Sequence, residues 1–161
     1  MAPSEAQRSR SARPQPAASG NERTDAFLDT NALIYRFEGA AAVQAAVASQ
    51  LAALVQETSA RTVAVSRLSW LACRVKPLRD GQAELLARYD AWFAAVTRTV
   101  EMDAAVVEQA TVLRAFHGLK TPDALIAASA LSLDDAILVT GDAAFARVPG
   151  LRTSVIALPA A

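Results

Sequence analysis

Residues 25–31 read DAFLDTN, and residues 136–142 read AILVTGD. In each stretch a short apolar run ends on polar residues that include an aspartate, Asp29 in the first and Asp142 in the second. Short, nearly continuous apolar runs predict strands that are buried on both faces, as in a parallel sheet. We therefore expect both aspartates to lie where buried strands end.

Short β-like runs alternate with longer helical patterns along the rest of the chain. We expect strands at 25–29, 61–65, 97–100, 136–139 and 153–158, and helices at 31–37, 40–59, 66–74, 82–96, 103–116 and 121–131. Pro77 is expected to close the third helix and Gly118 to end the fifth, while Thr121 caps the sixth. This alternation predicts the α/β class, with a parallel sheet flanked by helices on both faces.

The composition fits one globular domain. The chain has 161 residues, of which 53% are hydrophobic. No apolar run reaches the roughly 18 residues that a membrane span needs, and residues 1–24 lack the apolar segment of a signal peptide. We expect a soluble, cytoplasmic protein with no membrane partner. Residues 1–24 are predicted to form a disordered leader and residues 25–161 the folded domain.

Charge and rare residue types exclude several classes of function. Cys73 is the only cysteine and His117 the only histidine, which excludes an internal disulfide, a cysteine-based zinc cluster and most histidine-triad chemistry. The net charge is zero, and the body of the chain is slightly acidic because residues 1–24 carry four arginines against two glutamates. Such a body does not suit a general nucleic-acid coat protein. A nuclease is not excluded, because a metal held by carboxylates reverses the local field.

Three aspartates fall near expected carboxyl ends of strands, where open parallel sheets bind their ligands. Asp29 and Asp142 follow strands, and Asp123 lies in the first turn of the helix that begins at Thr121. Alone, Asp123 is explained by helix capping and Asp142 by turn chemistry. Three converging carboxylates would repel one another unless a cation lay among them. Hard oxygen ligands without histidine or cysteine select Mg²⁺ or Mn²⁺, ions that assist phosphoryl displacement.

Four blocks of the sequence resemble successive blocks of a PIN domain. They are AFLDTNALIY at 26–35, AVSRLSWLACRVKPL at 64–78, HGLKTPDALIAASAL at 117–131 and LVTGDAAF at 138–145. They are most similar to the VapC-type toxin ribonucleases of bacterial VapBC toxin–antitoxin pairs. The resemblance implies a PIN-like (Rossmann-like) domain that binds Mg²⁺ or Mn²⁺ and cleaves structured RNA such as tRNA or rRNA. It also implies a homodimer and a cognate VapB-type antitoxin whose tail occupies the active site.

The resemblance also assigns roles to individual residues. It makes Asp29 and Asp123 direct metal ligands, and it places Asp142 in the outer shell or in contact with a bound water. Thr140 is expected to orient these acids through its hydroxyl group. One position departs from the pattern, because Ala72 stands where similar sequences carry a glutamate.

No nearby acid replaces the missing glutamate, since the next ones, Asp80 and Glu84, follow Pro77. An alanine can neither bind metal nor hold a water. Either the glutamate was replaced deliberately so that a toxic protein could be produced, or the gene has drifted towards an inactive binding protein. The undamaged flanking residues favour the first explanation. In both cases we expect weaker metal binding and poor cleavage.

The sequence therefore predicts a metal-dependent endoribonuclease, the toxin half of a toxin–antitoxin pair, weakened at Ala72. One alternative is a non-catalytic PIN-fold module that binds RNA or a partner. Another is a Mg²⁺-dependent phosphatase or phosphotransferase, but those enzymes usually carry a second Asp two residues after the first, where this chain has Asn31. Five cations flank the expected acidic edge and are candidates for contacts with RNA phosphates: Arg67, Arg74, Lys76, Arg79 and Lys120.

Overall fold

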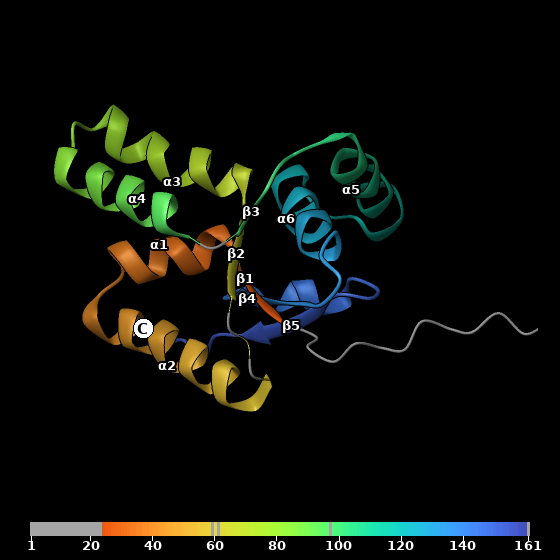
Figure 1. Ribbon diagram of the computed structural model, residues 1–161, viewed down its shortest axis with the longest axis horizontal. Helices are drawn as coiled ribbons and strands as arrows, with labels where there is room; N and C mark the ends of the chain where they lie inside the picture. The colour runs from red at the N-terminus through yellow and green to blue at the C-terminus, as the bar shows by residue number, and fades with distance from the viewer. Residues whose placement is uncertain (1–23, 59, 61, 97, 161) are drawn as a thin grey trace, which may run out of the picture.

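The computed structural model describes residues 24–58, 60, 62–96 and 98–160 (Figure 1). Within them five strands, six α-helices and one short 3-10 helix follow one another. In chain order these are β1 Asp25–Leu28, α1 Thr30–Glu38, α2 Ala41–Thr58, β2 Thr62–Ser66, α3 Arg67–Arg79, α4 Ala83–Ala95, β3 Arg98–Val100, α5 Ala104–His117, α6 Thr121–Leu131, β4 Ala136–Thr140, the 3-10 helix η1 Ala143–Arg147 and β5 Arg152–Val155. The predicted leader lies, except for Thr24, outside the described residues.

The strands form one sheet in the order β3-β2-β1-β4-β5, and every neighbouring pair is parallel. This confirms the predicted class. Leu28 at the end of β1 pairs with Val65 of β2 on one side and with Val139 of β4 on the other. The chain therefore leaves all three central strands at the same edge. The chain progresses from β1 to β2 on one side of β1 and from β4 to β5 on the other. Because the direction of progression reverses between β1 and β4, this edge is the topological switch point where such sheets bind ligands.

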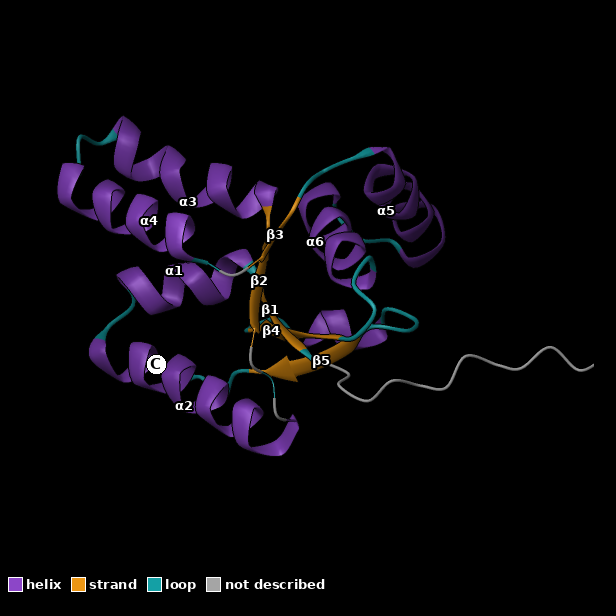
Figure 2. Ribbon diagram, in the orientation of Figure 1, coloured by secondary structure: helices purple, strands orange, loops and turns teal. Residues whose placement is uncertain are grey.

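Helices cover both faces of the sheet (Figure 2). Along β1, Ala26 and Leu28 point into one core cluster and Phe27 into the other. Helices α1 to α4 pack over the first face, whereas α5, α6 and η1 pack over the second. Burial on both faces explains the nearly continuous apolar run of this strand. In the described part of the chain, no helix combines the length and apolar character of a bilayer span.

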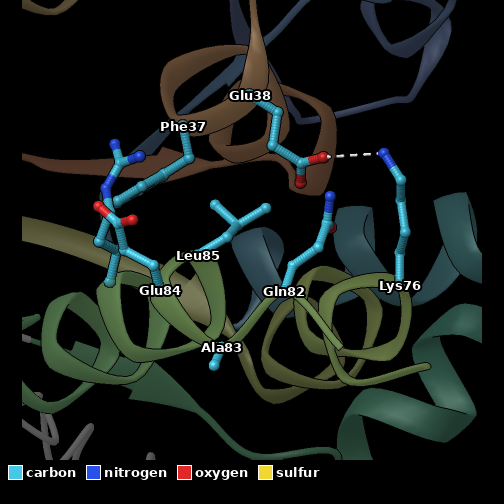
Figure 3. A pocket seen from close by; sticks show the side chains of 8 residues that line it. Phe37, Glu38, Lys76, Gln82, Ala83, Glu84 and Leu85 are labelled. Atoms are coloured by element: carbon cyan, nitrogen blue, oxygen red, sulfur yellow. Dashed lines mark hydrogen bonds and ion pairs between the residues drawn. The ribbon is translucent and has the colours of Figure 1, made fainter. Parts of the chain in front are cut away.

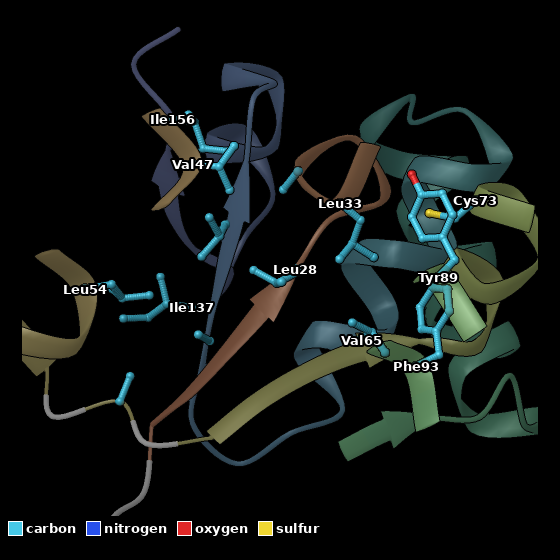
Figure 4. Packing of buried hydrophobic residues seen from close by; sticks show 14 residues of the cluster. Leu28, Leu33, Val47, Leu54, Val65, Cys73, Tyr89, Phe93, Ile137 and Ile156 are labelled. Atoms are coloured by element: carbon cyan, nitrogen blue, oxygen red, sulfur yellow. The ribbon is translucent and has the colours of Figure 1, made fainter. Parts of the chain in front are cut away.

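The core on the face of α1 to α4 contains most of the aromatic side chains, and Figure 4 shows part of it. Trp70 of α3 stacks on Phe93 of α4 with ring centroids 4.8 Å apart, and Tyr89 lies 6.2 Å from Phe93. The opposite face is packed differently. Helix α6 buries mainly alanines there, and small side chains let a helix approach a sheet closely.

Two helix ends differ from the predictions. Pro77 does not close α3, which continues to Arg79. The ring is buried and stands near the helix end, so it removes only one helical hydrogen bond. Its own carbonyl still accepts a 2.8 Å bond from Gln82 N. Lys120, rather than Thr121, precedes the first turn of α6. Gly118 does end α5, in a left-handed conformation with φ of 65°.

Shortening a buried side chain of strand β4 should destabilise the whole fold. Leu138 is fully buried between the sheet and the α5–α6 layer. We expect Leu138→Ala to lower the free energy of unfolding by about 2–5 kcal/mol, because it removes buried methylenes and leaves a cavity. The control is Leu158→Ala, at a leucine that is 39% exposed. Urea denaturation should show a clearly smaller loss for the control, and equal losses would contradict the placement of β4.

Candidate active site

Asp29 is the first residue after β1 and the residue that caps α1. Its side chain and backbone are 4% exposed in total. The Asp29 amide donates to the Val139 carbonyl at 3.0 Å, and its own carbonyl accepts from Leu33 N at 3.2 Å. The backbone is thus held by both the neighbouring strand and the following helix. The carboxylate lies at a helix N-terminus, where the helix dipole favours negative charge.

A single hydroxyl group connects two of the predicted acids. Thr140 is fully buried at the end of β4, and its Oγ1 donates to Asp29 Oδ2 at 2.8 Å. The same oxygen accepts from the Asp142 amide at 3.0 Å. Asp142 Oδ1 in turn accepts from Ala144 N at 2.8 Å and begins η1. Thr140 therefore contacts the carboxylate of Asp29 but only the backbone of Asp142.

The three aspartates influence one another electrostatically. Burial raises the pKa of Asp29 above its ordinary value, the Thr140 hydroxyl opposes the rise, and the negative charge of Asp123 adds to it. Burial also raises the pKa of Asp123, with the charge of Asp142 adding to the rise and Lys120 opposing it. The charge of Asp123 thus acts on Asp29, and the charge of Asp142 acts on Asp123.

A buried carboxylate usually needs a positive partner, because desolvation penalises its charge. In the described part of the chain, no lysine or arginine forms an ion pair with Asp29. The available donors are carboxylate and hydroxyl oxygens, which fit a hard divalent cation. They are not gathered tightly, however: among the described residues no group of three or more His, Cys, Asp or Glu side chains is placed to hold a metal ion.

Position 72 lies on the face of α3 that is turned towards α1. Ser69, one turn earlier, has its Oγ 2.9 Å from Thr30 Oγ1 of α1. Lys76, one turn later, has its Nζ 3.3 Å from Glu38 Oε2 at the end of α1. Residues spaced by three and four share a helix face, so Ala72 lies between these two contacts.

Cys73, the neighbour of Ala72, is influenced by acidic groups at both ends of α1. Burial raises the pKa of Cys73 to about 12, and the negative charges of Glu38 and then Asp29 add to the rise. Both ends of α1 therefore act on this turn of α3. A longer acidic side chain at position 72 would extend from α3 into the region between them, close to the N-terminus of α1 that carries Asp29.

Most of the cations predicted to face RNA are instead paired with acids. Four of the five form ion pairs, in each case with a partner that the local sequence pattern did not indicate: Arg67 with Glu101, Arg74 with Asp90, Lys76 with Glu38 and Arg79 with Asp80. Within the described residues Lys120 forms no ion pair. It lines a pocket with Asp123, Asp142 and Arg147. Arg147 was missed in the sequence, where its only signal was its position five residues after Asp142.

A larger pocket of about 590 Å³ lies away from the acidic edge, between the end of α1 and helices α3 and α4 (Figure 3). Glu38 and Lys76 face each other across it and form the ion pair drawn in the figure. Tyr89 also donates its hydroxyl to Glu38 at 2.8 Å. Because Glu38 already has two partners here, we interpret this pocket as a structural contact region between helices.

The fold is an α/β domain with a parallel sheet, and the buried Asp29 lies at its switch point. The chain belongs to the PIN-domain family, whose model, described as "PIN domain", matches residues 26–151. This match and the structural neighbours described next confirm the resemblance to VapC-type PIN domains. A comparison with curated proteins found no match.

Solved structures of toxin–antitoxin complexes share this fold. A toxin–antitoxin complex from Klebsiella pneumoniae contains a chain that is 25% identical, with a TM-score of 0.63 over 80% of this chain and 97% of that one. In VapBC2 from Rickettsia felis, bound to a DNA fragment from its promoter, the matching chain is 21% identical, with a TM-score of 0.64 over 81% of this chain and 97% of that one. In VapBC-1 from nontypeable Haemophilus influenzae the matching chain is 18% identical, with a TM-score of 0.61 over 82% of this chain and 98% of that one. At these lower identities the likeness concerns the fold.

Removing the Thr140 hydroxyl should destabilise the site specifically. Thr140→Val keeps the shape but leaves Asp29 Oδ2 and the Asp142 amide without this partner. We expect the free energy of unfolding to fall by about 1–3 kcal/mol, the usual cost of an unsatisfied buried polar group. Thr140→Ser retains the hydroxyl and should lose clearly less. Urea unfolding that finds the valine variant as stable as the serine variant would contradict this role of Thr140.

Proposed function

We propose that the chain is a metal-dependent endoribonuclease of the VapC type, the toxin component of a toxin–antitoxin pair, weakened by Ala72. The observation that carries the proposal is the buried Asp29 carboxylate, which feels the charge of Asp123 and forms no ion pair within the described residues. Membership of the PIN-domain family and the likeness to toxin–antitoxin complexes support the reaction class.

Each acid has a distinct role in this proposal. Asp29 and Asp123 would hold Mg²⁺ or Mn²⁺, and Asp142 would assist through a water. The bound ion would supply positive charge that activates a water and stabilises the oxygens of a phosphoryl displacement. Thr140 keeps the Asp29 carboxylate in one orientation through its hydrogen bond. The α1 N-terminus favours the ionised form of that carboxylate, the form that binds a cation.

Ala72 explains why this chain should cut poorly. Its methyl group cannot hold a cation or a water, although its helix face is turned towards α1 and the acidic edge. With only the three aspartates, the site lacks the carboxylate that α3 would contribute. The same observation favours a second candidate function, a non-catalytic PIN-fold module that binds RNA or a protein partner.

The proposed partners are a structured RNA of the tRNA or rRNA class, a VapB-type antitoxin and a second copy of the chain. The antitoxin proposal rests on the solved toxin–antitoxin complexes. A small antitoxin gene beside this one would support it, and the absence of such a gene would count against it. The homodimer proposal rests on an exposed apolar stripe along α3, formed by Leu71, Val75 and Leu78 at spacings of four and three.

Restoring the missing carboxylate should restore cleavage. We expect Ala72→Glu to cut RNA at least about 10–100-fold faster than the present chain with Mn²⁺ or Mg²⁺, and not in EDTA. Adding Asp29→Asn to the restored protein should abolish the cleavage. The measurement is cleavage of a broad RNA panel under the three conditions.

The outcomes separate the two candidate functions. EDTA-sensitive cleavage that depends on Asp29 supports the nuclease. If both proteins are folded, and neither cuts any RNA of the panel, the catalytic proposal is wrong and the binding module takes its place. Hydrolysis of a small phosphoester without RNA cleavage would instead favour a phosphatase.

The α3 stripe provides a test of the homodimer. Light scattering on the intact chain should give about twice the 16.9 kDa of one copy. Leu71→Asp combined with Leu78→Asp should give monomers, since these leucines are 59% and 67% exposed on one copy and the change puts charge into the apolar contact. The matched control is Val107→Asp with Val112→Asp on α5, at exposed apolar residues of the other layer. A monomeric intact chain would contradict the proposal.

A further inference from the structure

A pocket of about 210 Å³ opens beside the acidic edge, between the α5–α6 loop and η1. Its lining includes the acids Asp123 and Asp142, the cations Lys120 and Arg147, and the apolar Leu119 and Phe145. The pocket is therefore continuous with the proposed catalytic acids. It carries both signs of charge within the space of a small ligand, which distinguishes it from the apolar pocket beside α3.

The two cations of this pocket are available for a ligand. In the described part of the chain neither Lys120 nor Arg147 forms an ion pair, whereas the four cations of α3 all do. Lys120 is close enough to Asp123 for its charge to act on that carboxyl group. Both side chains are exposed, so a ligand can reach them from solvent.

The backbone that carries these cations is well supported. Arg114 Nη1 donates to the Leu119 carbonyl at 3.2 Å, and Gly118 turns the chain with a positive φ just before Leu119. On the other side, Asp142 caps η1, and Arg147 Nε donates to the Ala144 carbonyl at 3.3 Å. Phe145 is buried under η1 and anchors it to the core. The pocket walls are thus built on contacts that exist without a ligand.

We propose that this pocket binds the nucleotide next to the scissile phosphate, with Lys120 and Arg147 contacting phosphate oxygens of a single-stranded RNA segment. The inference rests on the proposed function and adds the substrate-binding side of the same site. Asp123 and Asp142 repel a free anion. In the proposed complex one phosphate lies at Lys120 and Arg147, and its neighbour lies at the divalent cation that the acids would hold. The small volume suits one unstacked nucleotide of a loop or bulge, the form in which proteins usually reach RNA bases.

The test measures binding without catalysis. A fluorescent single-stranded RNA is titrated with the present chain at several salt concentrations, with Ca²⁺ in place of Mg²⁺ or Mn²⁺ so that the acids can hold a cation. The RNA is checked to be intact at the end of the titration. Lys120→Ala with Arg147→Ala should weaken binding roughly tenfold and make the slope of log K against log[salt] shallower by about 1.4, since each lost contact with a single strand accounts for about 0.7. Lys120→Arg with Arg147→Lys keeps both charges and should retain most of the binding.

The matched control is Lys76→Ala with Arg79→Ala. It removes the same two residue types from the last turn of α3, roughly 14–18 Å along the helix from its start at the acidic edge. The control should change binding much less than the pocket variant. If both variants weaken binding equally, the RNA responds only to general charge and the pocket proposal is wrong.

A second readout separates this proposal from the proposed function. In the Ala72→Glu background, Lys120→Ala with Arg147→Ala should raise KM with a smaller change in kcat, because it removes contacts outside the acids. Restored cleavage with an unchanged KM would overturn the pocket proposal and leave the nuclease in place. Failure of Ala72→Glu to cleave, together with RNA binding that depends on Lys120 and Arg147, would overturn the nuclease and leave the pocket as an RNA-binding site.

Discussion

The hydrogen bond from Thr140 to Asp29 is the contact on which the site depends. It joins the ends of two neighbouring strands, β1 and β4, and it lies in the buried interior. A carboxylate in such a place is costly unless its oxygens are satisfied. The Thr140 hydroxyl meets part of that requirement, and the N-terminus of α1 meets another part. What is still missing within the described residues is a positive charge, and that need gives the acidic edge its proposed affinity for a cation.

The parallel register explains why distant residues meet at this point. Leu28, Val65 and Val139 are aligned across three strands, so the residues that follow each of them emerge at one edge. Strand β1 lies between β2 and β4. The chain runs outward from β1 to β2 and β3 on one side, and later from β4 to β5 on the other. The helices of the two layers begin or end there, which leaves a crevice between them. Asp29 stands at the end of the central strand in that crevice.

The two layers contribute different chemistry to the edge. The layer of α1 to α4 is held by aromatic packing, and its Ser69 contacts Thr30, the residue that follows Asp29. Position 72 lies on the same face of α3 as Ser69. The layer of α5, α6 and η1 is packed with small side chains and presents Asp123, Asp142 and two cations, Lys120 and Arg147, that form no ion pair within the described residues. In the proposed reaction, the acids at the boundary would hold the ion, and the second layer would hold the RNA chain. The two layers contribute different side chains because different helices begin at the ends of different strands.

The sequence by itself determined the order of strands and helices along the chain and the parallel class of the sheet, because strands that are buried on both faces leave continuous apolar runs. It also pointed to the three aspartates as candidates near strand ends, because turns and helix starts have characteristic local residues. Through its resemblance to VapC-type toxins it also predicted that Ala72 stands where those sequences carry a glutamate, and this stays a prediction. It could not show which cations are free, since Lys76 is neutralised by Glu38, which lies 38 positions away along the chain. It placed the end of α3 wrongly at Pro77, because a proline in the last turn is tolerated when its ring is buried. The pocket formed by Lys120 and Arg147 was decided only by the tertiary structure, since it requires the α5–α6 loop and η1 to be brought together by the packing of two separate segments against the same sheet.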